Sequence, residues 1–141
     1  MSSDFSEAVL DASILIQTLV KEKYTNVALR FVSLLKAIYV PSLVFYEIGN
    51  ALVILARKNL ITKEDAIRKL NHLNAIPTLT AREVTYSKAM ELAIELEITL
   101  YDASYLTLAF QTDAPLVTAD RELYEKGKTT TKMIHASEVV L

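Results

Sequence analysis

The sequence predicts an α/β protein in which a parallel β-sheet lies between two layers of helices, a three-layer sandwich. Short, almost wholly apolar segments alternate with longer segments whose apolar residues recur at helical spacing. The apolar segments show little polar–apolar alternation, which is typical of parallel strands covered on both faces. Because the 141 residues contain no linker, repeat or low-complexity stretch, we expect a single domain over residues 1–141.

Four segments are predicted as strands, and a fifth is a weaker candidate. Residues 8–10 are apolar and stop at Asp11, and residues 38–40 combine β-branched and aromatic side chains before Pro41. The later strands are predicted at 116–117 and 133–134, and the weaker candidate spans 75–79.

Helices are predicted between these strands. A long, mostly apolar helix over 42–59 has Ser42 as its expected N-cap, and Thr62 followed by Asp65 is typical of the start of the next helix. The other predicted helices span 13–20, 26–37, 81–97, 101–110 and 121–126.

The composition excludes several classes of function. Fifteen Lys and Arg against seventeen Asp and Glu give a net charge of −2, which excludes a uniformly basic nucleic-acid-coating protein but not a nuclease with local basic patches. The absence of cysteine excludes disulfides, iron–sulfur clusters and thiol catalysis. Two glycines cannot build a glycine-rich phosphate cradle. His72 and His135 are not expected to be ligands, so any metal would be bound by oxygen.

No segment is predicted to enter a membrane. The apolar runs are much shorter than the ~20 residues that span a bilayer. The first residues include the acidic Asp4 and Glu7, whereas a secretory signal begins with basic residues. We therefore expect a cytoplasmic protein.

Four acidic residues occupy positions that surface solubility does not explain. Asp11 and Asp120 each end a predicted strand, and Asp102 opens a predicted helix. In open α/β sheets, ligands bind beyond the carboxyl ends of the strands, an edge that the helix starts also face. Glu47 lies inside the long apolar helix, where an unpaired carboxylate is costly to bury.

Simpler explanations exist for each acid taken alone. Asp11, Asp102 and Asp120 could each cap a helix N-terminus. Glu47 could form a structural ion pair or face solvent, and Asn50 on the same helix face could support it. Capping does not account for Glu47, however, so we expect the four acids to converge.

Convergence of these acids would require a counter-charge. Two like charges ~5 Å apart at an effective dielectric of ~20 repel by about 3 kcal/mol, and several such pairs rival the ~5–15 kcal/mol stability of a domain. Protonation or a divalent cation would relieve the repulsion. Oxygen ligands favour Mg²⁺ or Mn²⁺, and such a site is suited to phosphodiester hydrolysis.

At these residues the chain resembles the PIN-domain family of ribonucleases, and within it the VapC-type toxins of prokaryotic toxin–antitoxin pairs. The resemblance covers residues 9–139. The segments that carry it are Val9-Leu10-Asp11-Ala12-Ser13, Tyr46-Glu47-Ile48-Gly49-Asn50-Ala51-Leu52, Leu100-Tyr101-Asp102-Ala103-Ser104-Tyr105 and Leu116-Val117-Thr118-Ala119-Asp120.

The resemblance implies a sheet of strand order 3-2-1-4-5 and a metal-dependent endoribonuclease. It implies that the four acids hold Mg²⁺ or Mn²⁺, and that Ser13 and Thr118 support the metal site by hydrogen bonding. It further implies an RNA substrate, a homodimer and inhibition by a small antitoxin. Two alternatives remain open: a PIN-like module that binds RNA or protein without catalysis, and a stand-alone PIN nuclease of RNA processing.

The roles of one arginine and of three tyrosines remain open from the sequence. Arg121, next to Asp120, either faces the scissile phosphate or is a solvated arginine in the first turn of a helix. Tyr39, Tyr46 and Tyr105 lie in apolar segments and are expected in the core or at a dimer surface.

Overall fold

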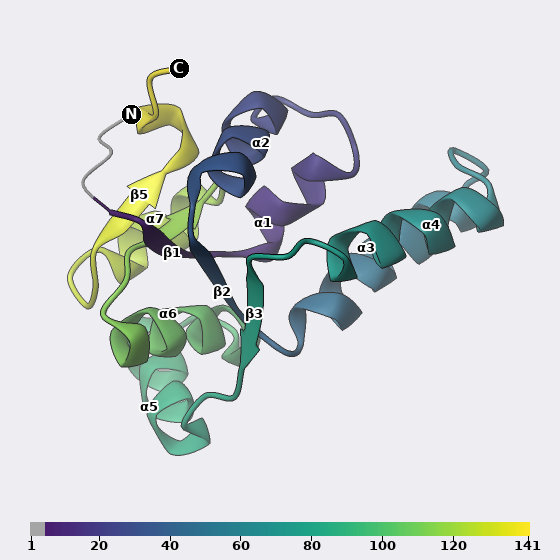
Figure 1. Ribbon diagram of the computed structural model, residues 1–141. Coiled ribbons are helices and arrows are strands. Elements are labelled where there is room, and N and C mark those ends of the chain that lie inside the picture. Colours follow the sequence, from purple (N-terminus) through teal and green to yellow (C-terminus); the bar gives the residue numbers. More distant parts are fainter. Residues whose placement is uncertain (1–4) are drawn as a thin grey trace.

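The protein, seen in a computed structural model that describes residues 5–141, has one parallel sheet between two layers of helices (Figure 1). The strand order β3-β2-β1-β4-β5 confirms both the predicted fold class and the order implied by the resemblance. The strands are β1 (Glu7–Leu10), β2 (Ala37–Pro41), β3 (Leu79–Arg82), β4 (Leu116–Thr118) and β5 (Met133–His135).

Seven α-helices connect these strands within the described residues. They are α1 (Ala12–Leu15), α2 (Thr25–Leu34), α3 (Val44–Arg57), α4 (Lys63–Asn74), α5 (Tyr86–Leu96), α6 (Leu100–Thr112) and α7 (Arg121–Gly127). Two short 3₁₀ turns, η1 (Ile16–Thr18) and η2 (Ala136–Glu138), follow α1 and β5. No helix of residues 5–141 has the length and apolar character needed to cross a bilayer.

The chain reverses its direction of travel across the sheet between β1 and β4. It runs outward from β1 to β2 and β3, and then returns to β4 and β5 on the other side of β1. The two central strands pair directly, with Leu10 opposite Val117. Because crossovers between parallel strands are right-handed, outward and returning helices cover opposite faces. Figure 1 shows α1 and α2 on one side of the sheet and α5 and α6 on the other.

The hydrophobic core explains why the central strands are apolar throughout, without alternating polar residues. Val9, Leu10, Leu116 and Val117 are fully buried, since both faces of these central strands are covered. Helix α6 is buried through its whole middle, residues 103–109. Its position against the sheet places its first turn beside the carboxyl ends of β1 and β4.

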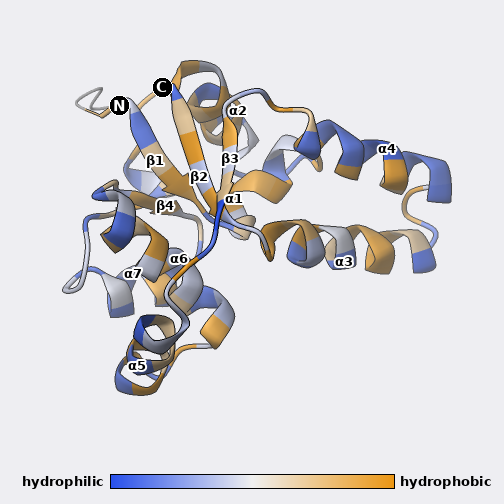
Figure 2. Ribbon diagram, turned by 60° about the horizontal axis from the view of Figure 1, so that its bottom comes forward, coloured by the Kyte–Doolittle hydropathy of each residue, from blue (hydrophilic) through white to orange (hydrophobic). Residues whose placement is uncertain are grey.

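Helices α3 and α4 extend away from the sheet as a hairpin (Figure 1). Figure 2 shows the same hairpin projecting to one side, with hydrophilic residues along much of α4. Val44, Ile48 and Leu52 are the buried residues of α3. Only one stripe of α3 is therefore held by the core, and its first turn carries Glu47 to the sheet edge.

The structure corrects the predicted region 75–97. Residues 75–78 form turns rather than a strand, and β3 begins at Leu79, where the prediction ended it. Strand β3 pairs with β2 at the edge of the sheet, so its polar residues Thr80 and Arg82 stay partly or fully exposed. Because of these polar residues, β3 lacks the apolar run by which the other strands were predicted. Helix α5 consequently starts at Tyr86 rather than at residue 81.

Three predicted helix ends also differ from the structure. The segment 13–20 divides into α1 and the η1 turn, and the helix predicted to reach residue 37 ends at Leu34 because Ala37 joins β2. Ser42 does not cap α3: Leu43 occupies that position without a side-chain hydrogen bond. The Ser42 hydroxyl donates instead to Glu83 Oε1 at 2.9 Å, which ties the end of β2 to the loop after β3.

Candidate active site

The four acidic residues lie at one edge of the molecule, beyond the carboxyl ends of β1 and β4. Asp11 directly follows β1 and Asp120 comes two residues after β4, which pairs with β1. Asp102 is in the first turn of α6 and Glu47 is in the first turn of α3. The reversal of strand order thus brings together side chains that are far apart in sequence, as expected for ligand sites in open α/β sheets.

Asp11 is buried and fully hydrogen-bonded. Its Oδ1 accepts from Ser13 Oγ at 2.6 Å and from the Ile14 backbone N–H at 3.2 Å. Its Oδ2 accepts from Thr118 Oγ1 at 2.6 Å. Asp11 is therefore the N-cap of α1, as one explanation of the sequence held, and it is also joined to β4.

The hydroxyls of Ser13 and Thr118 connect Asp11 to the turn before Asp120. The Ala119 backbone N–H donates to Ser13 Oγ at 2.9 Å, and the Asp120 N–H donates to Thr118 Oγ1 at 3.0 Å. The same two side chains that hold the Asp11 carboxyl thus hold the backbone that presents Asp120. Ser13 and Thr118 therefore link Asp11 to Asp120, and their supporting role at a metal site stays a prediction.

Asp120 and Asp102 differ in what they do for their helices. Asp120 Oδ1 accepts from the backbone N–H groups of Glu122 and Leu123, at 2.9 and 3.2 Å, so Asp120 caps α7. Asp102 does not cap α6, because Thr99 holds that position and its Oγ1 accepts from the Asp102 N–H at 3.0 Å. The two carboxylates line a cavity of about 120 Å³.

Glu47 receives a hydrogen bond that the sequence did not predict. Tyr105 Oη donates to Glu47 Oε1 at 2.6 Å, across the gap between α6 and α3. The Tyr105 ring is 1% exposed and lies one helical turn beyond Asp102, a spacing that points both side chains to the same side of α6. Asn50 is exposed, and no hydrogen bond joins it to Glu47 in the described part of the chain.

Burial raises the pKa of three of the four carboxyls. The pKa of Asp11 rises to about 7, mainly because burial disfavours the charged form, with a smaller contribution from Asp102. Burial also raises the pKa of Glu47 and of Asp102. Asp102 raises the pKa of Glu47 further by repulsion, and Asp120 does the same to Asp102. The repulsion expected from the sequence contributes to these shifts, and burial is the larger cause of each raised pKa.

No basic side chain in the described part of the chain is paired with this cluster. Within residues 5–141, no lysine or arginine forms a salt bridge with Asp11, Glu47, Asp102 or Asp120. The donor set consists of carboxylates and neutral hydroxyls, which are ligands that Mg²⁺ and Mn²⁺ prefer. In their present positions, no three acidic or histidine side chains of residues 5–141 are arranged to coordinate one ion. The donor chemistry of the cluster fits a divalent cation.

Arg121 lies at the outer rim of this edge. It is exposed, its guanidinium lies 5.4 Å from the Tyr124 ring centroid, and its Nη2 donates to Ser137 Oγ at 3.1 Å. The same nitrogen is 3.3 Å from His135 Nδ1. His135 is 4% exposed and contacts the backbone next to Asp120, so it is a second residue whose importance the sequence did not reveal.

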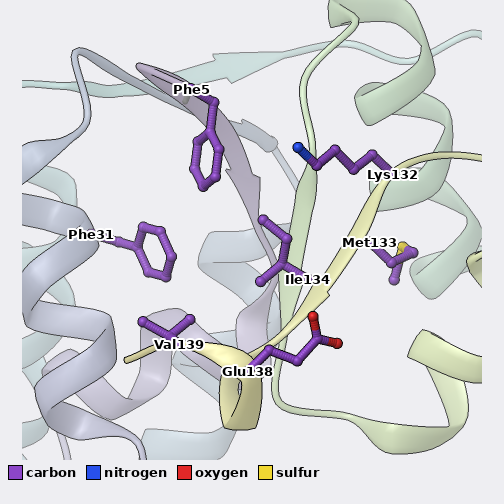
Figure 3. Close-up of a pocket in the computed structure, with 7 residues that line it drawn as sticks. All are labelled: Phe5, Phe31, Lys132, Met133, Ile134, Glu138 and Val139. Carbon is purple, nitrogen blue, oxygen red and sulfur yellow. The ribbon is translucent and has the colours of Figure 1, made fainter. Parts of the chain in front are cut away.

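A separate cavity of about 230 Å³ opens beside β5 and α2, as Figure 3 shows. Its apolar walls come from Phe5, Phe31, Met133, Ile134 and Val139. Lys132 and Glu138 supply the charged groups of its lining. None of the four clustered acids lines it, so this cavity is not part of the candidate site.

The fold and this acidic edge define a PIN domain: the PIN-domain family matches residues 8–129, and the chain belongs to that family. This confirms the resemblance seen in the sequence. Among individual proteins, the chain is similar to Ribonuclease VapC3 of Pyrobaculum aerophilum. The two are 34% identical over 122 residues, which cover 84% of this chain and 92% of the relative.

Solved structures show the same fold. The crystal structure of PAE2754 from Pyrobaculum aerophilum is 30% identical, with a TM-score of 0.71 and coverage of 94% of this chain and 92% of that one. VapBC2 of Rickettsia felis, bound to a promoter DNA fragment, is 19% identical, with a TM-score of 0.66 and coverages of 92% and 98%. FitAcB of Neisseria gonorrhoeae is 12% identical, with a TM-score of 0.67 and coverages of 94% and 99%.

Proposed function

We propose that this protein is a metal-dependent endoribonuclease that hydrolyses RNA phosphodiester bonds, and that it is the toxin of a VapBC-type toxin–antitoxin pair. One observation carries the proposal: four carboxyls that form no salt bridge within residues 5–141 gather at the edge of a PIN fold where the strand order reverses. The similarity to a protein named as a ribonuclease, over most of both chains, supports the choice of RNA as substrate.

In this proposal Asp11, Glu47, Asp102 and Asp120 hold Mg²⁺ or Mn²⁺. When bound, a divalent ion polarises the phosphoryl oxygen and lowers the pKa of water. Because the pKa of Asp11 is about 7, this carboxyl must lose its proton to bind a cation, so metal affinity should rise with pH through this range.

The neighbouring side chains have positioning roles in the proposal. Ser13 and Thr118 fix Asp11 relative to Asp120. Tyr105 fixes the Glu47 carboxylate by its short hydrogen bond. Arg121 meets a phosphate of the RNA next to the cleaved bond, where it would supply positive charge that the acidic cluster lacks.

The test is cleavage of a mixed RNA pool by the purified protein. We expect cleavage with Mn²⁺ or Mg²⁺ and none with excess chelator. Asp11→Asn should abolish cleavage, and Asp113→Asn is the matched control, because Asp113 is exposed in a left-handed backbone conformation that asparagine tolerates. Equal cleavage by wild type and Asp11→Asn would indicate contamination and overturn the proposal. RNA binding without cleavage would favour the non-catalytic module.

Two macromolecular partners belong to the same proposal: a small antitoxin and a second copy of the chain. VapBC2 of Rickettsia felis, one of the similar structures, is named for two components, and large apolar side chains are exposed on α3, α4 and α5 of this chain. Analytical ultracentrifugation tests for the homodimer. Co-purification with the product of an adjacent small gene, with loss of RNA cleavage in the complex, tests for the antitoxin; cleavage that persists in every such complex would favour a stand-alone nuclease.

A further inference from the structure

His135 lies beside the acidic cluster, although it comes fifteen residues after Asp120 in the sequence. It is the last residue of β5, it pairs in register with Thr118, and its side chain is buried. The rings of Tyr24 and Tyr124 meet it edge-on, each with its centroid 5.9 Å away. The imidazole is therefore held in one orientation from two sides.

The hydrogen bonds of His135 determine which ring nitrogen carries the proton. The Ser137 backbone N–H donates to Nδ1 at 3.0 Å, the Ser137 hydroxyl, which can also donate, lies 2.7 Å from Nδ1, and the donor-only guanidinium of Arg121 faces it at 3.3 Å. Nδ1 must therefore be an acceptor, and in a neutral ring the proton lies on Nε2. That N–H donates to the Ala119 carbonyl oxygen at 3.2 Å.

This bond completes the restraint of one peptide group. In the peptide between Ala119 and Asp120, the oxygen accepts from His135 and the N–H donates to Thr118 Oγ1. The preceding N–H, that of Ala119, donates to Ser13 Oγ. Ser13 and Thr118 also hold Asp11. The N–H groups of the turn are thus tied to Asp11 through Ser13 and Thr118, and the Ala119 carbonyl oxygen is bonded to His135.

We propose that His135 is a positioning residue that sets the location of the Asp120 carboxyl relative to Asp11, through its Nε2–H bond to Ala119. The proposal rests on the proposed function, because the position of Asp120 matters most if the two carboxyls share an ion. Residues that orient ligands in this way typically contribute 10–100-fold to metal affinity or activity.

Two substitutions separate this role from the packing of the ring. In His135→Asn, the side-chain oxygen takes the place of Nδ1, so the bond from Ser137 is kept and the donor to Ala119 is lost. In His135→Gln, the amide nitrogen reaches the place of Nε2 and keeps that donor. Both variants lose the same ring contacts with Tyr24 and Tyr124, so each is the stability control for the other.

We expect His135→Asn to lower kcat by about tenfold or more and to weaken Mn²⁺ binding by a similar factor. The KM for RNA should stay unchanged, because in this proposal His135 acts through Ala119 and not through the substrate. His135→Gln should recover most of both losses. Equal kcat and Mn²⁺ affinity in His135→Asn and wild type would overturn the proposal, as would equal losses in the two variants.

A measurement without metal or RNA tests the structural step directly. Nitrogen-15 NMR of the imidazole should show the neutral tautomer with the proton on Nε2, and amide hydrogen exchange at Asp120 should be faster in His135→Asn than in His135→Gln. A proton on Nδ1, or equal exchange, would overturn the proposal. If the wild type neither cleaves RNA nor binds Mn²⁺, the proposed function fails, and these two readouts still decide whether His135 holds the turn.

Discussion

Replacement of Asp11 by asparagine should stabilise the metal-free protein at alkaline pH while it abolishes activity. Asparagine keeps the two bonds that its oxygen accepts from Ser13 and Ile14. Its amide nitrogen takes the place of Oδ2 and donates to Thr118 Oγ1, whose own hydrogen turns to Ser13 Oγ, 3.3 Å away. The change therefore removes a buried charge and little else.

The magnitude follows from the pKa of Asp11, which rises from 3.8 to about 7 on folding. Between these values the folded protein keeps the proton that the unfolded chain has lost, so the free energy of unfolding falls as pH rises. The contribution is fully present below pH 4 and fully lost above pH 7, and the difference is about 4 kcal/mol. Glu47 and Asp102 remain in both proteins and largely cancel from the comparison.

The assay is urea denaturation followed by circular dichroism, with chelator, at a series of pH values from 4 to 9. The wild-type curve should approach the Asp11→Asn curve at pH 4 and fall below it by about 4 kcal/mol at pH 8. Asp113→Asn should follow the wild type throughout. Parallel wild-type and Asp11→Asn curves over the whole range would show that burial does not raise the pKa of Asp11.

Three further predictions concern the surroundings of Asp11. Mn²⁺ at a hundred times its dissociation constant should raise the free energy of unfolding of the wild type by about 2.7 kcal/mol, and that of Glu47→Gln by much less. Equal increases in the melting temperature of the two proteins would place the ion elsewhere. Tyr105→Phe should cost about 1.5–3 kcal/mol at pH 8, because the half-buried Glu47 carboxylate loses its donor, and unchanged stability would count against this bond. Thr99→Ala should cost about 1 kcal/mol in urea denaturation, since it removes the cap of α6; no loss would show that Asp102, not Thr99, caps the helix.

The amino-acid sequence determined the fold class and the elements with strong local signals. Buried segments such as residues 8–10 and 116–117 are apolar throughout because the fold covers both of their faces, and that property is visible without coordinates. The same holds for the cap at Thr62, whose Oγ1 accepts from the Asp65 N–H at 3.0 Å as its spacing predicts.

Strand β3 shows where the local signal fails. It lies at the sheet edge and pairs only with β2, so Thr80 and Arg82 are tolerated on it and no apolar run marks its position. Its secondary structure is set by pairing with residues some forty positions earlier in the chain. The residues next to β3 in the sequence do not indicate that pairing, which is why the predicted helix over 81–97 began too early.

The candidate site, too, could be predicted from the sequence only in part. The four acids could be selected from the sequence, because three follow strands or open helices and Glu47 is out of place in an apolar helix. Only the tertiary structure decided what surrounds them: the hydroxyl of Tyr105 on Glu47, and the ring of His135 behind the turn that carries Asp120. These contacts join α6 to α3 and β5 to the turn between β4 and α7. They form only when the helices and strands pack together, so no single segment of the sequence encodes them.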